Sequence, residues 1–459
     1  MIDALAGRLF RRGDEGYDDA RIGRVFNARR PDRHPAAVLL AESDADVIAG
    51  VRAAADRGWQ VAVRAGGHSW AAWSVRDDTL LIDLGRLRDM SYDAVTTIAT
   101  AGPSVQGGQE LAPLLAGYGR FFAGGHCPTV GLGGFLLQGG MGWNARGWGW
   151  AAESVVAVDV VTAAGELVRA DADHRDLYWA ARGAGPSFPG VITRFHLATR
   201  PHPAHVAETV HVYALDVFDE VMTWLHERHH EISADVEIVA LTQHLPEPIP
   251  GHDAIVLVVT GTALVDTPDQ AREALAPYAT CPVIDRALVR VDAAPVAFAD
   301  LRARQVAANP EGHRYRVDNA WLTGPAAEVV PAMRRSFVEL PTHQSFTIWF
   351  SMAPLRTLPD MALSMQSEIY VATYVVSSEP ADDARVHAWV DAVRAEMEPC
   401  TVGQYLGDSD LTNRQVKFMG DDAFARLREI RIGRDPDARF VSYLTAGDVP
   451  LNTNHWEAS

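Results

Sequence analysis

The segment GGHCPTVGLGGFLLQGGMGWNARGWG, residues 124–149, contains ten glycines, and such a density needs a structural reason. Glycine adopts positive φ at no steric cost and lets the backbone approach a ligand closely. Successive backbone N–H groups in such turns form anion-binding concavities, which suit a pyrophosphate. The alternative is a glycine-rich surface loop that binds nothing. The segment therefore predicts either a cofactor site or an exposed loop.

A second glycine pair stands upstream, in WQVAVRAGGHSW, residues 59–70. His68 follows that pair directly, and Cys127 follows the pair that opens the first segment after one intervening histidine. A histidine behind two glycines is usually a loop residue, and a single cysteine is usually a small buried apolar residue. Two such turns in one α/β unit, each with a nucleophilic side chain, indicate a shared site.

The surrounding residues have the rhythm of a mixed α/β unit. AAVLLAES (36–43) and TLLIDLGRL (79–87) are typical of strands. Residues 44–58 predict a helix with Asp44 or Asp46 as its N-cap. The glycine turns therefore lie at the ends of strands and helices.

The common nucleotide-binding fingerprints are absent from the sequence. Gly131-Leu132-Gly133 would need a third glycine where Leu136 stands, and Gly183-Ala184-Gly185 would need one where Phe188 stands. No G-x-x-x-x-G-K-[ST] occurs either. A Rossmann or P-loop site is therefore disfavoured.

The order of the two nucleophile loops identifies a resemblance. Arg64–Ser69 resembles the covalent histidine loop of the berberine-bridge-enzyme-like family of FAD-linked oxidases, within the vanillyl-alcohol-oxidase, or PCMH-type, flavoprotein superfamily. Cys127–Gly134 resembles the family's covalent cysteine loop, which Gly139–Gly142 continues, and Trp179–Gly185 resembles its Trp-x-x-Arg-Gly-x-Gly segment. Further matches near the C-terminus are Gly420, Arg426, Leu427, Asp435, Pro436 and Phe440. The resemblance spans nearly the whole chain.

The resemblance implies a bicovalently attached FAD. His68 would bond the flavin 8α-methylene carbon and Cys127 the flavin C6, while the flavin carries the hydride chemistry. In this family the third residue after the cysteine gates O2, and Val130 looks like the small residue of oxidases; the alternative is a loop residue with no such role. The other implied cofactor contacts are Arg64, Ala65, Gly66, Gly67, Ser69, Gly125, Thr129, Gly133, Gly134, Gly139, Gly140, Gly142 and Val191.

The catalytic base cannot be carried over directly from the family. The family places a tyrosine base in a Tyr-x-Asn-Tyr-x-Asp segment, whereas this chain reads Tyr405-Leu406-Gly407-Asp408-Ser409-Asp410. Gly407 replaces the asparagine, and Asp408 falls where the base would be. Asp408 and Tyr405 therefore become candidates, and a carboxylate in that role needs burial to raise its pKa.

Two strand-like runs offer further candidates. In SEIYVATYVV the period of two places Glu368, Tyr370 and Tyr374 on one face, which fits the wall of a pocket. In QSFTIWFSMA the face that carries Trp349 is assigned to the same pocket. The alternative is a cross-strand aromatic pair on a solvated sheet face.

The alternation of strands and helices, together with the family resemblance, predicts an α+β fold for the chain of 459 residues. Its two-lobed PCMH-type FAD-binding domain, built of two α/β subdomains, would comprise residues 1–205. A substrate domain with an antiparallel sheet flanked by helices would comprise 206–412, and 413–459 would return to the FAD domain. The Pro-rich RPHPAH, residues 200–205, marks the first boundary.

Composition limits the partners. A formal charge of −18 disfavours nucleic-acid binding, and three scattered cysteines make neither a disulfide framework nor a four-cysteine zinc site. The longest apolar run, residues 254–265, is too short to cross a bilayer. The N-terminal residues lack the apolar core of a signal peptide, so we expect a cytoplasmic protein without an obligate protein partner.

His226-x-x-His229-His230 has spacing that could hold a metal on a helix. No third distant ligand is evident and the helix is highly charged, so a solvated helix face is favoured and no metal is expected.

These observations predict an FAD-dependent oxidase that acts on an alcohol, hemiacetal, phenol or related small organic substrate, with O2 reduced to H2O2. A secondary-metabolite substrate is favoured. The alternatives are an oligosaccharide oxidase, a quinone-linked dehydrogenase and a non-catalytic flavoprotein that sequesters a drug-like aromatic compound.

Overall fold

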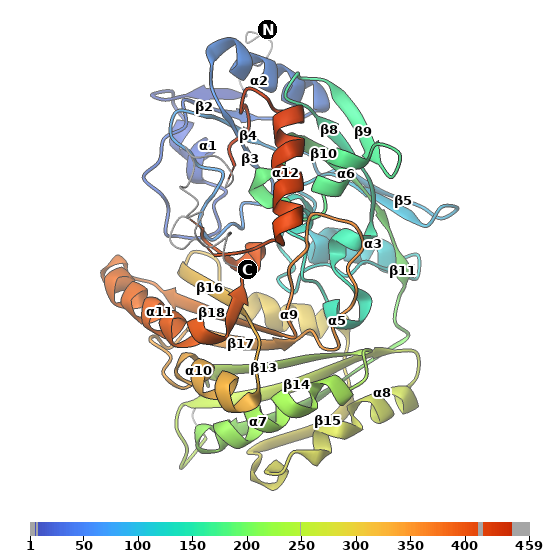
Figure 1. Ribbon diagram of the computed structural model, residues 1–459, viewed down its shortest axis with the longest axis vertical. Helices are drawn as coiled ribbons and strands as arrows, with labels where there is room; N and C mark the ends of the chain where they lie inside the picture. The colour runs from blue at the N-terminus through green and yellow to red at the C-terminus, as the bar shows by residue number, and fades with distance from the viewer. Residues whose placement is uncertain (1–4, 6–7, 248, 412–415, 443–459) are drawn as a thin grey trace.

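The computed structural model describes residues 5, 8–247, 249–411 and 416–442. It mixes helices with three larger β-sheets, which confirms the predicted α+β class. Parts of the predicted C-terminal return, namely 413–415 and 443–459, lie outside the described residues. Two of the sheets lie in the upper part of the molecule and the third in the lower part (Figure 1).

The first sheet has the strand order β1-β2-β4-β3, in which β2, β4 and β3 run parallel. Its strands are β1 (Leu9–Arg11), β2 (Ala37–Leu40), β3 (Val61–Arg64) and β4 (Leu80–Asp83). Helix α2 (Asp44–Arg57) connects β2 to β3 and packs its apolar side on the sheet. The sequence predicted Asp44 or Asp46 as the N-cap, but Ser43 is the cap, since its hydroxyl accepts the Asp46 N–H.

The second sheet is antiparallel, with the order β5-β6-β10-β8-β9. Its strands are β5 (Met90–Asp93), β6 (Ile98–Ala101), β8 (Val155–Val161), β9 (Leu167–Asp171) and β10 (Val191–Ala198). The short pair β7 (Arg120–Phe121) and β11 (Arg200–Pro201) lies beside it. The helices of this upper part are α1 (Tyr17–Ile22), α3 (Ala112–Ala116), α4 (Leu132–Leu137), α5 (Ala145–Trp148) and α6 (Arg175–Ala180).

The third sheet is antiparallel and has the order β15-β12-β14-β13-β17-β18-β16-β19. Its strands are β12 (His205–Ala214), β13 (Val236–His244), β14 (Ile255–Val265), β15 (Val289–Pro295), β16 (Arg314–Leu322), β17 (Phe346–Ser351), β18 (Ile369–Ser377) and β19 (Thr401–Gly403). One face is covered by α7 (Phe218–Arg228), α8 (Pro268–Leu275), α10 (Ala326–Val338) and α11 (Asp383–Met397). The opposite face meets the upper part of the molecule, together with α9 (Phe298–Ala308).

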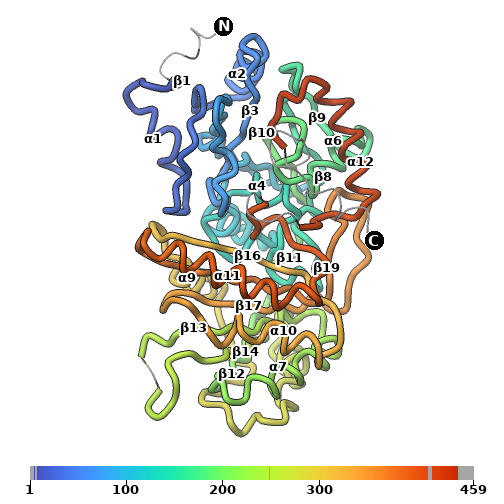
Figure 2. The backbone as a smooth tube through the Cα atoms, turned by 60° about the vertical axis from the view of Figure 1, so that its left-hand side comes forward, coloured from blue at the N-terminus to red at the C-terminus, as the bar shows by residue number. Residues whose placement is uncertain are grey.

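The chain returns to the upper part through α12 (Asp421–Arg434), which lies beside α6 in Figure 2. Arg434 pairs there with Asp176, and Phe440 forms a bridge with Val61 at the edge of the first sheet. Among the described helices, none is long and apolar enough to cross a membrane.

Candidate active site

The histidine loop and the cysteine loop are in direct backbone contact. The histidine loop leaves the carboxyl end of β3, and the cysteine loop leads into α4. A Cβ on Gly66 would lie 2.7 Å from the backbone nitrogen of Gly131, and one on Gly131 would lie 2.8 Å from the Cα of Gly66. Only glycine at both positions allows this approach, which explains why two separate glycine turns build one site.

The two nucleophiles meet at the hydroxyl of Thr129. Its Oγ1 lies 3.2 Å from Nε2 of His68 and 3.4 Å from Sγ of Cys127. The His68 ring is stacked on Phe26, with 4.4 Å between ring centroids. His68, Cys127 and Thr129 are each partly exposed. The structure thus brings together the residues that the sequence paired.

Burial sets the protonation of both nucleophiles. It lowers the pKa of His68 to about 4, because desolvation penalises the imidazolium. His68 is therefore neutral near pH 7 and has a nitrogen lone pair available. Burial also raises the pKa of the Cys127 thiol, although hydrogen bonds with Thr129 partly oppose this. Cys127 is a thiol here, not a thiolate.

A network around the partly exposed Asp408 carboxylate lies close to these loops. Trp70, two residues after His68, donates its indole N–H to Oδ1 of Asp408 at 3.1 Å. Tyr370 donates its hydroxyl to Oδ2 of Asp408 at 2.7 Å, and Tyr374 interacts with the same carboxylate. Burial, and then the Asp408 charge, raise the pKa of Tyr370 well above its usual value, so its phenol remains a neutral donor.

Asp408 contacts both Trp70 in the upper part of the molecule and Tyr370 in the large sheet. It belongs to a short turn, residues 406–408, whose backbone is held by the side chain of Asn319 in β16. Its charge also helps to raise the pKa of the Cys127 thiol. A carboxylate predicted only as a substitute for a missing tyrosine thus lies within electrostatic reach of Cys127.

Tyr405 is engaged elsewhere. Its hydroxyl accepts the backbone N–H of Met141 at 3.1 Å, and its own N–H donates to Asn319. It is buried, and burial raises its pKa. These contacts attach the Asp408 turn to the glycine-rich segment, so Tyr405 holds the site in place.

Aromatic side chains line the sheet face beside Asp408. Register pairs Phe350 with Tyr370 and Phe346 with Tyr374, so these four share the face that meets the upper lobe. The Phe346 and Tyr374 rings are stacked at 4.7 Å. Phe346 and Phe350 are partly exposed within this interior face.

Two predicted residues of this wall are misplaced. Glu368 precedes β18 and is exposed, with its charge acting on His226, so it does not share the face of Tyr370. Trp349 is fully buried on the opposite face of the sheet, where its ring lies 5.4 Å from that of His229. The alternation within β17 correctly grouped residues that share a face with Trp349, but that face packs against the helices and not against the upper part of the molecule.

Arg64 also differs from its prediction as a cofactor contact. Its guanidinium is 2% exposed and pairs with Asp83, and it donates to the carbonyls of Ala20 and Arg21. The side chain therefore anchors α1 to the base of the histidine loop.

The remaining predicted cofactor residues follow the two loops and their continuation. Gly125 bridges to Gly142, and Gly139 and Gly140 have φ of 97° and 74°, which only glycine adopts readily. Val191 is fully buried at the start of β10. Partly or fully exposed positions along the loops are Ala65, Gly67, Ser69, Val130 and Gly134, whereas Gly133 is buried.

Comparisons with known proteins identify the family of the chain and support its fold. Residues 35–171 match the model of the FAD binding domain family. The chain is 34% identical over 431 residues to the FAD-linked oxidoreductase ptmO of Penicillium ochrochloron, covering 93% of this chain and 94% of that protein. The chain belongs to the FAD-linked oxidoreductases.

One further relative matches a shorter part of the chain, and two solved structures share its fold. The xylooligosaccharide oxidase of Thermothelomyces thermophilus is 36% identical to this oxidoreductase over 184 residues, or 39% of this chain and 37% of that one. The structure of 6-hydroxy-D-nicotine oxidase from Arthrobacter nicotinovorans has a TM-score of 0.83 at 20% identity, covering 96% and 98% of the two chains. Berberine bridge enzyme from Eschscholzia californica has a TM-score of 0.81 at 19% identity, covering 97% of each.

The residues of this FAD-linked oxidoreductase fit a bound FAD. A Cβ on Gly134 would meet nothing within 4 Å, so the backbone at the start of α4 faces open space. His68 and Cys127 stand partly exposed near this backbone, one as a neutral imidazole and one as a thiol. The donor set therefore matches a flavin held along the two loops.

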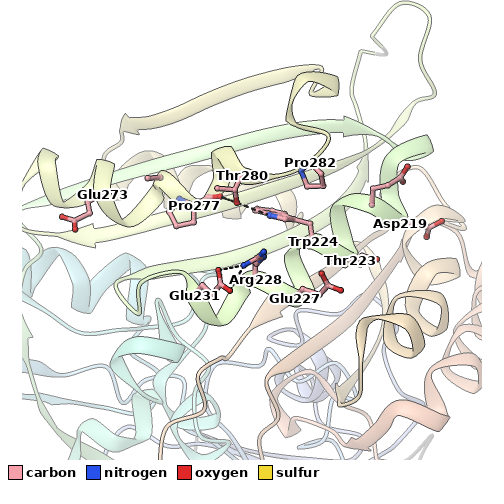
Figure 3. Close-up of a pocket in the computed structure, with 12 residues that line it drawn as sticks. Asp219, Thr223, Trp224, Glu227, Arg228, Glu231, Glu273, Pro277, Thr280 and Pro282 are labelled. Carbon is pink, nitrogen blue, oxygen red and sulfur yellow. Dashed lines mark hydrogen bonds and ion pairs between the residues drawn. The ribbon is translucent and has the colours of Figure 1, made fainter.

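A separate hollow of about 1040 Å³ lies on the helix-covered face of the large sheet (Figure 3). It runs between α7 and the segment after α8, and Trp224 and Arg228 line it together with acidic side chains. None of the predicted site residues of the oxidoreductase lines it. Among the described residues no cluster of three or more His, Cys, Asp or Glu could hold a metal, and this includes His226, His229 and His230 at the end of α7 and just after it.

Sequence reasoning missed several residues of the oxidoreductase site. Trp70 directly follows the Arg64–Ser69 loop. Its position two residues after His68 was the one feature of the sequence that could have marked it as a site residue. Asn319 and Glu237 come from strands far away along the chain, and no pattern marks them. His126 adjoins Cys127, and only the structure shows that Glu237 holds it.

Proposed function

We propose that this oxidoreductase is an oxidase that holds FAD through both His68 and Cys127 and oxidises a hydroxyl group of an aromatic natural product. The observation that carries the proposal is the Asp408 carboxylate, held by Trp70 and Tyr370 close to the two nucleophiles. The pairing of a neutral imidazole with a thiol at one threonine hydroxyl supports double attachment.

Asp408 acts as the proton acceptor. Two neutral donors, the Trp70 indole and the Tyr370 phenol, orient its carboxylate and leave lone pairs for a substrate O–H. A positioned general base contributes roughly 10²–10⁴-fold to such a rate. Tyr370 keeps its proton, so its role is to orient the carboxylate.

The reaction balances as a two-electron oxidation. The substrate hydroxyl gives its proton to Asp408, a carbonyl forms, and the hydrogen on carbon leaves as hydride. FAD held at His68 and Cys127 would supply the acceptor for this hydride, and O2 with two protons would take up the electron pair as H2O2. Attachment to the two loops would fix the position of the flavin. Tyr370 of the large sheet orients Asp408, the proposed base.

The aromatic wall favours a flat, apolar substrate. Phe346, Phe350 and Tyr374 offer ring faces beside the carboxylate, and flat aromatic compounds stack on such rings. A sugar also stacks on aromatic rings, and the match to a xylooligosaccharide oxidase keeps an oligosaccharide as the second candidate.

Val130 supports O2 as the electron acceptor. It is a small, partly exposed residue three positions after Cys127, where the family's oxidases have small residues. A dehydrogenase that uses a quinone would need O2 to be excluded from this position. The order of reoxidation rates with O2 and with a quinone separates these alternatives.

The test starts with the intact mass of the denatured holoenzyme and mapping of its peptides. Addition of one FAD to peptides containing His68 and Cys127 supports double attachment, and addition at His68 alone removes the sulfur link. A panel of aromatic alcohols and oligosaccharides is then screened for anaerobic bleaching of the flavin. Colour that returns in air with formation of H2O2 supports an oxidase, and bleaching that persists in air until a quinone is added contradicts it.

A further inference from the structure

His126 and Glu237 form an imidazole–carboxylate pair at the edge of the same site. Nε2 of His126 lies 2.9 and 3.0 Å from the two oxygens of Glu237, which projects from β13. Oε2 of Glu237 also accepts the backbone N–H of Asn144 at 2.7 Å. The pair therefore joins the glycine-rich segment to the large sheet.

The Glu237 carboxylate is buried and therefore needs hydrogen-bond donors. Its side chain is 7% exposed, and burial of a carboxylate is unfavourable unless donors compensate it. Within the described part of the chain no lysine or arginine pairs with it, and its donors are His126 and Asn144. Among the side chains that the structure describes, His126 is the hydrogen-bond donor to Glu237.

The pair fixes which nitrogen of His126 is free. A carboxylate only accepts hydrogen bonds, so Nε2 donates to Glu237, and in the corresponding imidazole tautomer Nδ1 is an acceptor. Nδ1 makes no hydrogen bond with any described residue, and the side chain remains 18% exposed.

The ring contacts of His126 place it on the aromatic wall. Its ring lies 4.5 Å from that of Trp143 and 5.4 Å from that of Phe350. Phe350 in turn lies 6.3 Å from Tyr370, the donor to Asp408. Phe350 therefore lies between two polar groups, the His126 ring and the Asp408 carboxylate that Tyr370 holds.

We propose that His126 recognises a second hydroxyl group of the substrate. Nδ1 accepts a hydrogen bond from that hydroxyl while Asp408 receives the proton at the oxidised position, and Glu237 is the positioning residue that holds the ring. The inference rests on the proposed function and narrows its substrate to aromatic alcohols with a further hydroxyl group. No bond to His126 forms or breaks in this step.

The experiment compares probes that differ by one hydroxyl. Benzyl alcohol and 4-hydroxybenzyl alcohol form one pair, and 2-naphthalenemethanol and its 6-hydroxy derivative form another. Each is titrated anaerobically into the holoenzyme, and the shift of the oxidised flavin spectrum is recorded before any bleaching. We expect the hydroxylated member of at least one pair to bind about tenfold tighter, the size of one net hydrogen bond.

Two variants separate recognition from a merely structural role. In His126→Gln the amide takes the place of Nε2 and keeps Glu237 satisfied, but nothing replaces Nδ1, so the tenfold preference is lost. In His126→Asn the amide takes the place of Nδ1, so much of the preference remains. Glu237→Gln loosens the ring and lowers the preference, which is read as the ratio of the two affinities within each pair of probes.

The outcomes are distinct. A wild-type enzyme that discriminates neither pair, or a His126→Gln variant that keeps the full preference, overturns the proposal. Loss of preference in His126→Asn and His126→Gln alike, together with weaker binding of benzyl alcohol, indicates a structural role and also overturns it. If no alcohol bleaches the flavin, the proposed function fails, while the binding ratios remain readable.

Discussion

Asp408 is the residue on which the proposed chemistry depends. The Asp408→Asn substitution keeps the shape and the acceptor oxygen but cannot take a proton. We expect the rate of anaerobic flavin reduction to fall by roughly 10²–10⁴-fold, because general-base catalysis is lost. The FAD content should not change, since Asp408 contacts neither His68 nor Cys127 directly. Stopped-flow absorbance with a substrate from the screen measures the rate.

Tyr370→Phe is the matched control for that residue. It removes one donor to the carboxylate and leaves the bond from Trp70 and the interaction with Tyr374. A loss of about tenfold is expected, since one net hydrogen bond to a charged group is weakened and the base itself remains. If the Asp408→Asn variant reduced its flavin at the wild-type rate, Asp408 would be excluded as the base, whatever the Tyr370→Phe variant shows.

At the scale of elements, the contact between the two loops predicts a steric effect. The Gly66→Ala substitution places a Cβ 2.7 Å from the backbone nitrogen of Gly131, which cannot move without shifting the cysteine loop. We expect the variant to lose most of its covalent FAD and to unfold at lower temperature. Gly433→Ala in α12 is the control, because its Cβ would meet nothing within 4 Å. Absorbance of the denatured protein near 450 nm measures attached flavin, and equal attachment in both variants would contradict the prediction.

Strands show how far the sequence alone could go. Alternation identified Tyr370 and Tyr374 as one face of β18, and they do share the face that meets Asp408. The same reasoning chose the face of Trp349 in β17, which instead packs against helices. Both faces of this sheet are covered, so apolar residues occur on both and periodicity cannot tell them apart. Only the register, in which Phe350 opposes Tyr370, decides.

Long-range contacts set the second limit of sequence reasoning. His68 and Cys127 could be paired because their glycine loops carry a local pattern. Glu237 lies 111 positions from His126, and Asp408 lies 338 positions from Trp70. Such contacts depend on how the lobes pack, and no local period encodes them.

At the scale of the whole molecule, Asn27 ties the lobes together. It is fully buried, donates to the carbonyls of Trp70 and Tyr315, and accepts the N–H of Tyr315, each at 2.9 Å. Asn27→Ala would leave these buried backbone groups unpaired at a cost of about 1–3 kcal/mol each. We expect a loss of about 3 kcal/mol in the free energy of unfolding, measured by urea denaturation. An unchanged midpoint would mean that the lobes unfold independently of this contact.

The interior behind the large sheet predicts how stability depends on pH. His229 is 3% exposed, its Nδ1 lies 2.9 Å from the Ser351 hydroxyl, and burial lowers its pKa to about 3. In the unfolded chain the pKa returns to about 6.5, so between these values only the unfolded state binds a proton. Stability is therefore complete above pH 6.5 and declines as the pH falls towards 3.

The linked loss for His229 is about 2 kcal/mol between pH 7 and pH 5. His229→Asn removes the titrating group and keeps a polar atom at the position of Nδ1, so it should lose less stability over that interval by about that amount. Urea unfolding of wild type and variant at both pH values measures the difference. A difference near zero would show that the folded protein accepts a proton on His229, and that the helix-covered face of the sheet admits water to this ring.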